Sequence, residues 1–236
     1  MSDSCGLRDC VFSFCSAIAA AGCQKARANG SGRLTSCQAA NLGACYNRRV
    51  TPYEQLIAQT DSLSERLSAR YAGHLACGAG CSSCCQHHLS VFPVEAARIT
   101  AALDGLPQDL RRQLVQQAQA VNEREARGED ATCPLLVNDR CAIYASRPLI
   151  CRTQGLPLLF EAEDGAQEVD FCPLNFTAPD AVNELDEAHL VPLDVLNTQL
   201  ALANEQHCRA IGIAREQSGV RQRMSDLILQ AEAELR

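Results

Sequence analysis

The sequence lacks the features that mark several common classes of protein. It contains no long basic run and its net charge is −7, so its composition does not indicate a nucleic-acid partner. It has no run of about 18 apolar residues, so we expect no transmembrane helix and no membrane partner. No GxGxxG motif, phosphate-binding loop or internal repeat is recognisable. These absences favour a cytoplasmic protein and leave its function to other residues.

Catalytic signatures and lysine are scarce as well. No Ser-His-Asp or Cys-His set is recognisable, so catalytic residues stay unknown and the sequence does not decide whether the protein is an enzyme. Lysine occurs once, as Lys25, while arginine is common, and we interpret this as a bias of the genome. His74, His189 and His207 are interpreted as ordinary histidines.

Residues 1–50 differ from the rest of the chain. They contain six cysteines, six Lys or Arg and two Asp, and they show little periodicity. We expect a poorly structured cysteine-containing extension over residues 1–50 and a cysteine-cluster domain over residues 51–236. Two interpretations of the extension stand side by side. It is a real but flexible tail, or it is not native because translation starts at Val50.

A secretion signal at the N-terminus is not expected. The stretch 11–23 loosely resembles a bacterial lipoprotein signal, because it is apolar and ends in small residues and a cysteine. However, Asp3 and Asp9 precede it, and Ala20 stands where such signals usually have leucine.

Helical periodicity dominates after residue 50. Thr51, Pro52 and Glu54 form a capping pattern that predicts a helix beginning at residue 52. Further helices are predicted over about 93–103 and from about 106 into the charged run 122–130, which we interpret as a solvated helix end. Two more apolar stripes follow Pro179, one formed by Leu193, Leu196, Leu200 and Ala203 and the other by Val220, Met224, Leu227, Ala231 and Leu235.

Residues 133–172 change to shorter apolar runs. Asn138-Asp139 and Asp164-Gly165 lie between such runs, and both dipeptides are typical of hairpin turns. The expected fold class is therefore mainly α with a small β-hairpin region.

Cysteine is far more common than in an ordinary chain of this length, with fifteen residues. Eight of them lie between residues 77 and 172 and begin with the compact pattern C-x3-C-x2-C-C. Thiols this close together in a long chain indicate metal binding or redox chemistry rather than disulfide staples. The candidate metal ligands are Cys77, Cys81, Cys84, Cys85, Cys133, Cys141, Cys151 and Cys172.

Local structure is expected to bring these thiols together. If residues 81–88 form a helical turn, Cys81, Cys84 and Cys85 share one face of it. The first hairpin draws Cys133 and Cys141 together, and the second returns Cys172 to about the level of residue 157, near Cys151. Converging thiolates repel one another, and a cation both neutralises that charge and deprotonates the thiols. Cys84 and Cys85 therefore need not bond to each other, since each can point to a metal.

The sequence leaves the metal open. Eight thiols suit two four-thiolate sites, or an iron–sulfur cluster with spare ligands, and tetrahedral sulfur ligation fits both zinc and iron. The competing interpretation, that the cysteines are small buried apolar residues, is the one we apply to Cys208.

Several charged and aromatic residues lie near the thiols in the sequence, and we expect each to have either a functional or a structural role. Arg147 and Arg152 are candidate cofactor-binding residues, since they flank Cys151 and can offset thiolate charge or hold an anionic ligand; ordinary salt bridging is the alternative. Tyr144 is expected to pack in the core with its hydroxyl paired. His87 and His88 are expected to support the site or lie at the surface rather than ligate metal.

The segments "CGAGCSSCC", "FPVEAARI" and "CPLLVNDRCAIYASRPLICR", with a later "CP", resemble the bacterial CxxCxxCC family, also called YkgJ-type and related to flagellin N-methylase. The resemblance covers roughly residues 52–210. The eight candidate ligands match its cysteines, although three residues rather than two separate Cys77 from Cys81. Its second motif is matched by Ile143, Tyr144, Arg147, Pro148 and Arg152.

The resemblance implies a metal-binding protein that holds zinc or iron, an iron–sulfur cluster included, through clustered thiolates. Its flagellin-modifying relatives imply one alternative, an iron–sulfur enzyme that methylates lysine in a protein or peptide partner. A metallochaperone, or a metal or redox sensor, is the other alternative.

Overall fold

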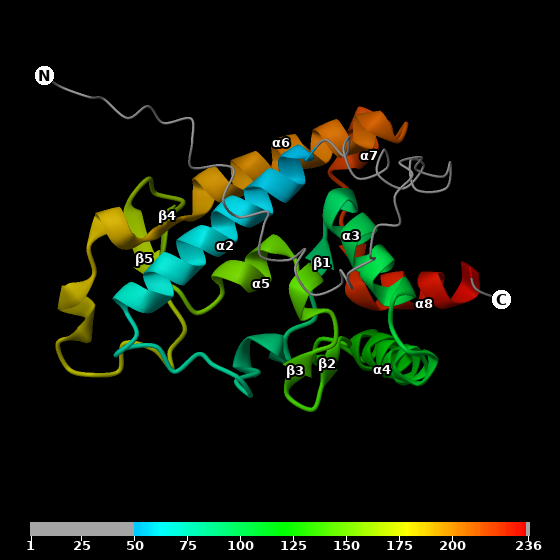
Figure 1. Cartoon of the computed structure of the whole chain (residues 1–236), viewed down its shortest axis with the longest axis horizontal. Helices are drawn as coiled ribbons and strands as arrows, with labels where there is room; N and C mark the ends of the chain where they lie inside the picture. Colours follow the sequence, from blue (N-terminus) through cyan, green and yellow to red (C-terminus); the bar gives the residue numbers. More distant parts are fainter. Residues whose placement is uncertain (1–49, 235–236) are drawn as a thin grey trace, which may run out of the picture. The chain divides into compact units, whose positions relative to one another are not determined.

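The structure is a computed structural model that describes residues 50–234, and the predictions for residues 1–49 lie outside this range. The described chain is mainly helical, as expected (Figure 1). Its α-helices are α2 (Pro52–Arg70), α3 (Pro93–Asp104), α4 (Gln108–Ala126), α5 (Leu149–Thr153), α6 (Leu193–Ala210), α7 (Arg215–Ser218) and α8 (Met224–Glu234). Four 3-10 turns accompany them: η2 (Ser83–Gln86), η3 (Tyr144–Ser146), η4 (Ala181–Glu184) and η5 (Glu187–His189). None of the described helices is both long and apolar enough to span a membrane.

Short strands form three small sheets between the helices. β1 (Ser90–Val91) pairs with β7 (Gln222–Arg223), and β2 (Leu136–Val137) pairs with β3 (Arg140–Cys141), both antiparallel. In the third sheet β4 (Leu158–Glu161) pairs antiparallel with β5 (Gln167–Asp170) and parallel with β6 (Val191–Pro192). The expected fold class, mainly α with a small β-hairpin region, is confirmed.

The predicted helix starts and turns follow from local chemistry. At the start of α2 the Thr51 hydroxyl accepts a hydrogen bond from the Glu54 amide (3.1 Å), and the Glu54 carboxylate accepts one from the Thr51 amide (2.8 Å). Asn138 and Asp139 both adopt positive φ, 50° and 57°, in the turn between β2 and β3. Gly165 (φ 83°) turns the chain between β4 and β5.

Val220 is the exception among the predicted apolar stripes. It is 59% exposed, because β7 intervenes and α8 begins only at Met224. Met224, Leu227 and Ala231 of the same stripe are buried in α8 as expected, and Leu235 lies outside the described residues.

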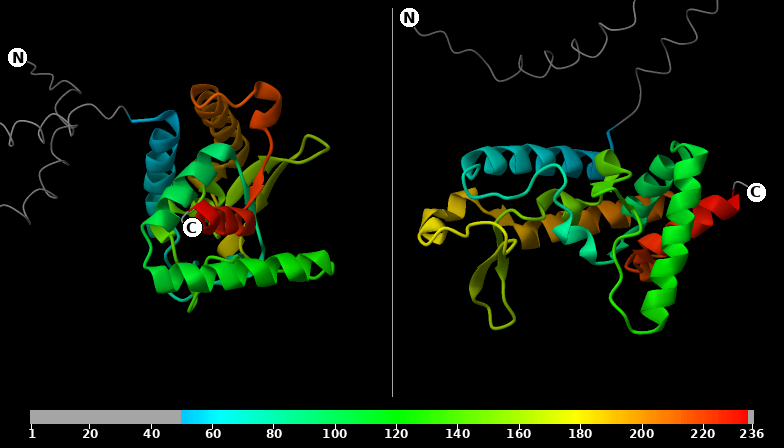
Figure 2. Two further views of the ribbon diagram at one scale, coloured as in Figure 1. Left: turned by 90° about the vertical axis from the view of Figure 1, so that its right-hand side faces the viewer. Right: turned by 90° about the horizontal axis from the view of Figure 1, so that it is seen from below.

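The apolar side chains of the described region form two clusters. The first joins α2, α5 and α6, with Leu56, Leu149 and Leu200 among its buried members. The second joins α3, α4 and α8, with Ile99 and Leu114 at its centre. Figures 1 and 2 show α2 beside α6 along one side, and α4 and α8 together at the other end of residues 50–234.

The cysteine-bearing segments run from one cluster to the other. Leu75 packs on the first cluster and Leu89 on the second, so residues 75–89 cross between them. Leu135 belongs to the second cluster and Leu156 to the first, so the segment from 135 to 156 crosses back. Six of the eight candidate ligands lie on these two segments, and Cys133 lies directly before the second.

Candidate metal centre

All eight candidate ligands are free thiols placed by short elements and loops. Cys77 and Cys81 precede η2, which itself carries Cys84 and Cys85. The helical turn expected over 81–88 is thus shorter, so Cys81 lies just before it. Cys77 and Cys84 are exposed, and the other six are partly buried.

Four of the thiols lie around the β2–β3 hairpin, and we call them the inner set: Cys85, Cys133, Cys141 and Cys151. The Cys133 amide donates to the Cys85 carbonyl (2.8 Å), which ties the hairpin to η2. Cys141 lies in β3 opposite Leu136, whose amide donates to the Cys133 carbonyl (3.1 Å). The expected proximity of Cys133 and Cys141 is confirmed, and both pack against the second apolar cluster.

Electrostatics link the inner thiols to one another. Burial, followed by the charges of Cys133, Cys141, Cys85 and Cys84, raises the pKa of Cys151 far above its ordinary value. Burial, together with the charges of Cys85, Cys141 and Cys84, raises the pKa of Cys133 to about 12. These thiols are close enough that ionising one opposes ionising the next.

The remaining thiols, Cys77, Cys81, Cys84 and Cys172, form what we call the outer set. Burial raises the pKa of Cys77, and the charges of Cys172, Cys81 and Cys84 add to that rise. Cys172 follows β5, and since Asp170 of that strand pairs with Leu158, Cys172 returns to about the level expected. The charge of Cys172 acts on Cys77, and its closeness to Cys151 stays a prediction.

Cys84 and Cys85 are adjacent in sequence, and each belongs to a different set. Burial, together with the charge of Cys85 and a hydrogen bond between the two side chains, raises the pKa of Cys84 to about 11. The same contact lowers the pKa of Cys85, against the larger effect of burial. The neighbours therefore contact each other as thiols rather than pointing apart.

Asn175 was not identified from the sequence, yet it holds the outer set together. Its side chain is buried, and its Nδ2 donates to Cys77 Sγ (3.4 Å) and to the Gly155 carbonyl (2.6 Å). Its Oδ1 accepts from the Ala76 amide (2.8 Å), and its own amide donates to the Cys172 carbonyl (2.8 Å). One amide side chain thus joins three segments that are distant in sequence.

Two backbone features keep Asn175 in place. Phe176 has φ 53°, a strained conformation for a bulky residue, and its ring packs on Tyr71 (5.3 Å between centroids) and Phe171 (4.9 Å). Gly155 has φ 93°, and a Cβ there would lie 2.5 Å from Cys77 Sγ. The absence of a side chain at Gly155 creates the space that the Cys77 sulfur fills.

Arg152 is a buried structural residue. Its Nη1 donates to both carboxylate oxygens of Asp61 (2.7 and 2.6 Å), and its Nε and Nη2 donate to the carbonyls of Arg147 (3.0 Å) and Ala145 (2.9 Å). Every guanidinium nitrogen therefore has a partner within the chain. Arg152 thus makes the salt bridge that was the alternative to cofactor binding. That Arg152 also holds an anionic ligand stays a prediction.

The charge of Arg147 acts on one of the thiols, Cys141. Burial raises the pKa of Cys141, while the charge of Arg147 lowers it. The Arg147 guanidinium stacks over the Tyr144 ring, 4.0 Å from its centroid. The prediction that Tyr144 packs in the core was wrong: the residue is 64% exposed, because the turn η3 directs it outward.

The histidines near the thiols are placed away from ligand roles. His87 is exposed. His88 is buried, with Nδ1 2.7 Å from the Glu125 carboxylate and Nε2 accepting from the Ser225 amide (3.1 Å). Both nitrogens of His88 are therefore engaged in joining β1 to α4 and α8.

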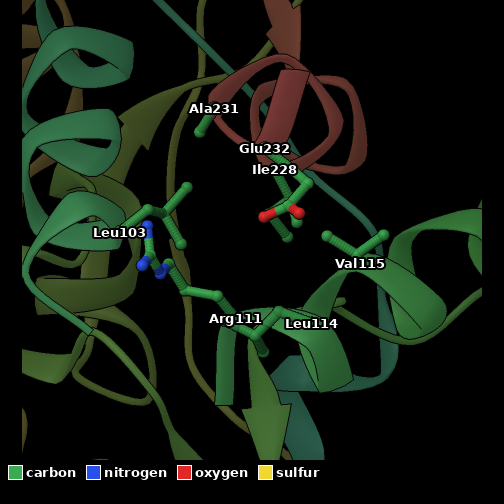
Figure 3. A pocket seen from close by; sticks show the side chains of 7 residues that line it. All are labelled: Leu103, Arg111, Leu114, Val115, Ile228, Ala231 and Glu232. Carbon is green, nitrogen blue, oxygen red and sulfur yellow. The ribbon is translucent and has the colours of Figure 1, made fainter. Parts of the chain in front are cut away.

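Within residues 50–234, no three or more Cys, His, Asp or Glu side chains converge closely enough to count as a formed metal site. The cavities also lie elsewhere. One of about 10 Å³ between α3, α4 and α8 has apolar walls with Arg111 and Glu232 at its edge (Figure 3). A cleft of about 390 Å³ lies between α6 and α7. Neither is lined by any of the eight cysteines.

Comparison with known proteins identifies the cysteine-bearing segment. No curated protein and no solved structure matches the chain. Residues 76–173 match the model of the CxxCxxCC family, described as "Putative zinc- or iron-chelating domain". The match contains all eight cysteines of the inner and outer sets, and it ends just after Cys172. Residues 76–173 are therefore similar to the CxxCxxCC domains, a family whose description is zinc or iron chelation.

Proposed function

We propose that the protein binds zinc or iron at two four-thiolate sites, one formed by the inner set and one by the outer set. The observation that carries this proposal is the grouping of the thiols. The charges that act on Cys151 come from the inner thiols and Cys84, whereas those that act on Cys77 come from the outer thiols. The adjacent Cys84 and Cys85 then contribute one sulfur to each site.

The chemistry of the donor groups fits such a metal. None of the eight thiols is fully buried, so they are poorly placed as apolar filler. Where they are neighbours, ionising one raises the cost of ionising the next. A divalent cation removes that cost, because it deprotonates the thiols and neutralises them together. Binding would bring together sulfurs that are neighbours in the structure but do not yet surround a common point. Thiolate sulfur suits both zinc and iron, and either metal would act here by cross-linking the segments that carry the ligands.

Metal analysis of anaerobically purified protein, combined with its visible spectrum, tests this proposal. We expect two metal ions per chain for mononuclear sites, colourless if both are zinc. A brown protein that contains inorganic sulfide would instead indicate an iron–sulfur cluster. Protein from an iron- and zinc-replete culture that holds neither metal, and takes up neither anaerobically, would refute the proposal.

The same preparation separates the remaining alternatives. An iron–sulfur enzyme that modifies a protein or peptide requires the brown form, so stoichiometric zinc alone would exclude it. A metallochaperone or sensor requires metal that leaves readily to a chelator, whereas unfolding on chelation indicates a structural site.

A further inference from the structure

The inner and outer sets differ in their exposure to solvent. Both fully exposed ligands, Cys77 and Cys84, belong to the outer set, whereas every inner thiol is partly buried. Cys133 and Cys141 also pack against the second apolar cluster. A chelator approaching from solvent therefore meets outer sulfurs first.

The sets also differ in the stiffness of their supports. The inner set is held by η2, the paired strands β2 and β3, and α5, and the amide of Cys133 bonds directly to Cys85 (2.8 Å). Among the outer thiols, Cys84 shares η2 with Cys85, but Cys77 and Cys81 lie in coil beside Gly78 and Gly80, and Cys172 follows β5, a strand exposed along its whole length. Local openings of the backbone are least costly in such segments.

Asn175 compensates for that weak support. Its side chain bonds to Cys77 Sγ (3.4 Å) and to the Ala76 amide (2.8 Å), and its backbone amide bonds to the Cys172 carbonyl (2.8 Å). Asn175 therefore links Cys77 to Cys172, two members of the outer set. An N–H donor to sulfur also stabilises thiolate over thiol, and such supporting hydrogen bonds tune metal affinity. The thiol that Asn175 contacts is Cys77, an outer ligand, so we expect its influence to fall mainly on the outer site.

We propose that the two sites have different roles. The outer set releases its metal to ligands that arrive from solvent, and the positioning residue Asn175 slows that release. The inner set retains its metal as part of the fold. In the exchange, bonds from the metal to the outer sulfurs are replaced by bonds to the incoming ligand, and each released thiolate takes up a proton from water. This inference rests on the proposed function, since it requires two loaded sites.

Chelator competition on the zinc-loaded full chain tests the difference. With a colorimetric chelator in excess and no oxygen, we expect two phases of equal amplitude, the first faster than the second by at least about 10-fold. Alkylation by iodoacetamide during the first phase should label Cys77 and Cys84 and spare Cys133 and Cys151. Two equivalents released in one phase, or Cys133 labelled as fast as Cys77, would overturn the inference while leaving the proposed function intact. Fewer than two equivalents bound would instead refute the proposed function.

Asn175→Asp isolates the role of the positioning residue. It keeps the size and an acceptor for the Ala76 amide, but loses the Nδ2 donor to Cys77 and brings in negative charge. We expect the fast phase to accelerate roughly 10-fold with the slow phase unchanged. Asn183→Asp is the matched control, because Asn183 is exposed and bonds only at 3.4 Å to Asp180. An unchanged fast phase, or equal acceleration of both phases, contradicts a positioning role; if the variant does not fold, the labelling order of the unaltered chain decides the inference.

Discussion

At the scale of single residues, the ion pair between Arg152 and Asp61 shows why proximity to cysteine does not by itself define a ligand-binding arginine. Arg152 adjoins Cys151 in sequence, but its guanidinium turns away to a carboxylate 91 residues earlier. The Arg152 side chain is 2% exposed and that of Asp61 is 37% exposed. The buried charge of Arg152 therefore depends on Asp61 to offset the cost of its burial.

Asp61→Asn should therefore destabilise the protein without removing a ligand. The change leaves Arg152 buried without its counter-charge, and we expect a loss of about 2 kcal/mol in the free energy of unfolding. Denaturant titration of the metal-loaded protein measures it. Asp109→Asn is the matched control, because its pair with Arg112 is at the surface and should matter little. Equal effects of the two substitutions would show that burial of Arg152 is not important.

Single thiol substitutions test the assignment of ligands. Cys84→Ser and Cys85→Ser should each lower the metal content by about half, since each removes one sulfur from one of two sites. Cys208→Ser should leave it unchanged, because Cys208 is buried in α6 (1% exposed), as expected of an apolar cysteine. Metal analysis after anaerobic desalting gives the result, and equal loading of all three variants would contradict the assignment.

At the scale of elements, Glu95 joins a helix start to the loop that carries Cys151. One of its carboxylate oxygens accepts from the Phe92 amide (3.1 Å) at the start of α3, and the other accepts from the Leu149 amide (2.9 Å) at the start of α5. Glu95 is 2% exposed, so neither amide can turn to water instead.

Glu95→Gln should loosen α5 relative to α3. The amide keeps one acceptor oxygen but presents an N–H₂ group to the other backbone donor, which leaves that donor unpaired. We expect the free energy of unfolding to fall by about 1–2 kcal/mol. Hydrogen exchange should report faster exchange at the Leu149 or Phe92 amide. Glu163→Gln, on the exposed turn between β4 and β5, provides the comparison; faster exchange in both variants would argue against a specific link.

The elements that could be predicted from the sequence are those specified by neighbouring residues. The Thr51–Glu54 capping box and the Asn138-Asp139 turn each depend on residues a few positions apart, and both formed as predicted. Asn175 and Asp61 were missed because their partners lie about a hundred positions away and nothing local marks them. Tyr144 was misplaced for a related reason: its motif suggests a packed aromatic ring, but the turn η3 decides the direction of the side chain.

At the scale of the whole described region, the segments that carry most of the thiols run between the two apolar clusters. Residues 75–89 and 135–156 pass between the clusters, and most of the candidate ligands lie on or beside these crossings. A metal bound there would hold the clusters together, so metal binding and global stability should be linked. The division into residues 1–50 and 51–236 stays a prediction.

This link should appear as opposite responses to pH. In the metal-free chain the pKa of Cys84 is about 11 and that of Cys133 about 12, mainly because of burial, against an ordinary value of 9.0. A raised folded-state pKa means that the folded chain binds more protons than the unfolded chain above about pH 9, so stability should fall as pH rises through that range. Metal-bound thiolates carry no proton, so the loaded protein should instead lose stability as pH falls and protons compete for the sulfurs. Melting curves from about pH 5 to 10, with and without metal, should therefore diverge at the alkaline end and converge at the acidic end; curves that stay parallel would mean that the metal is not held by these thiolates.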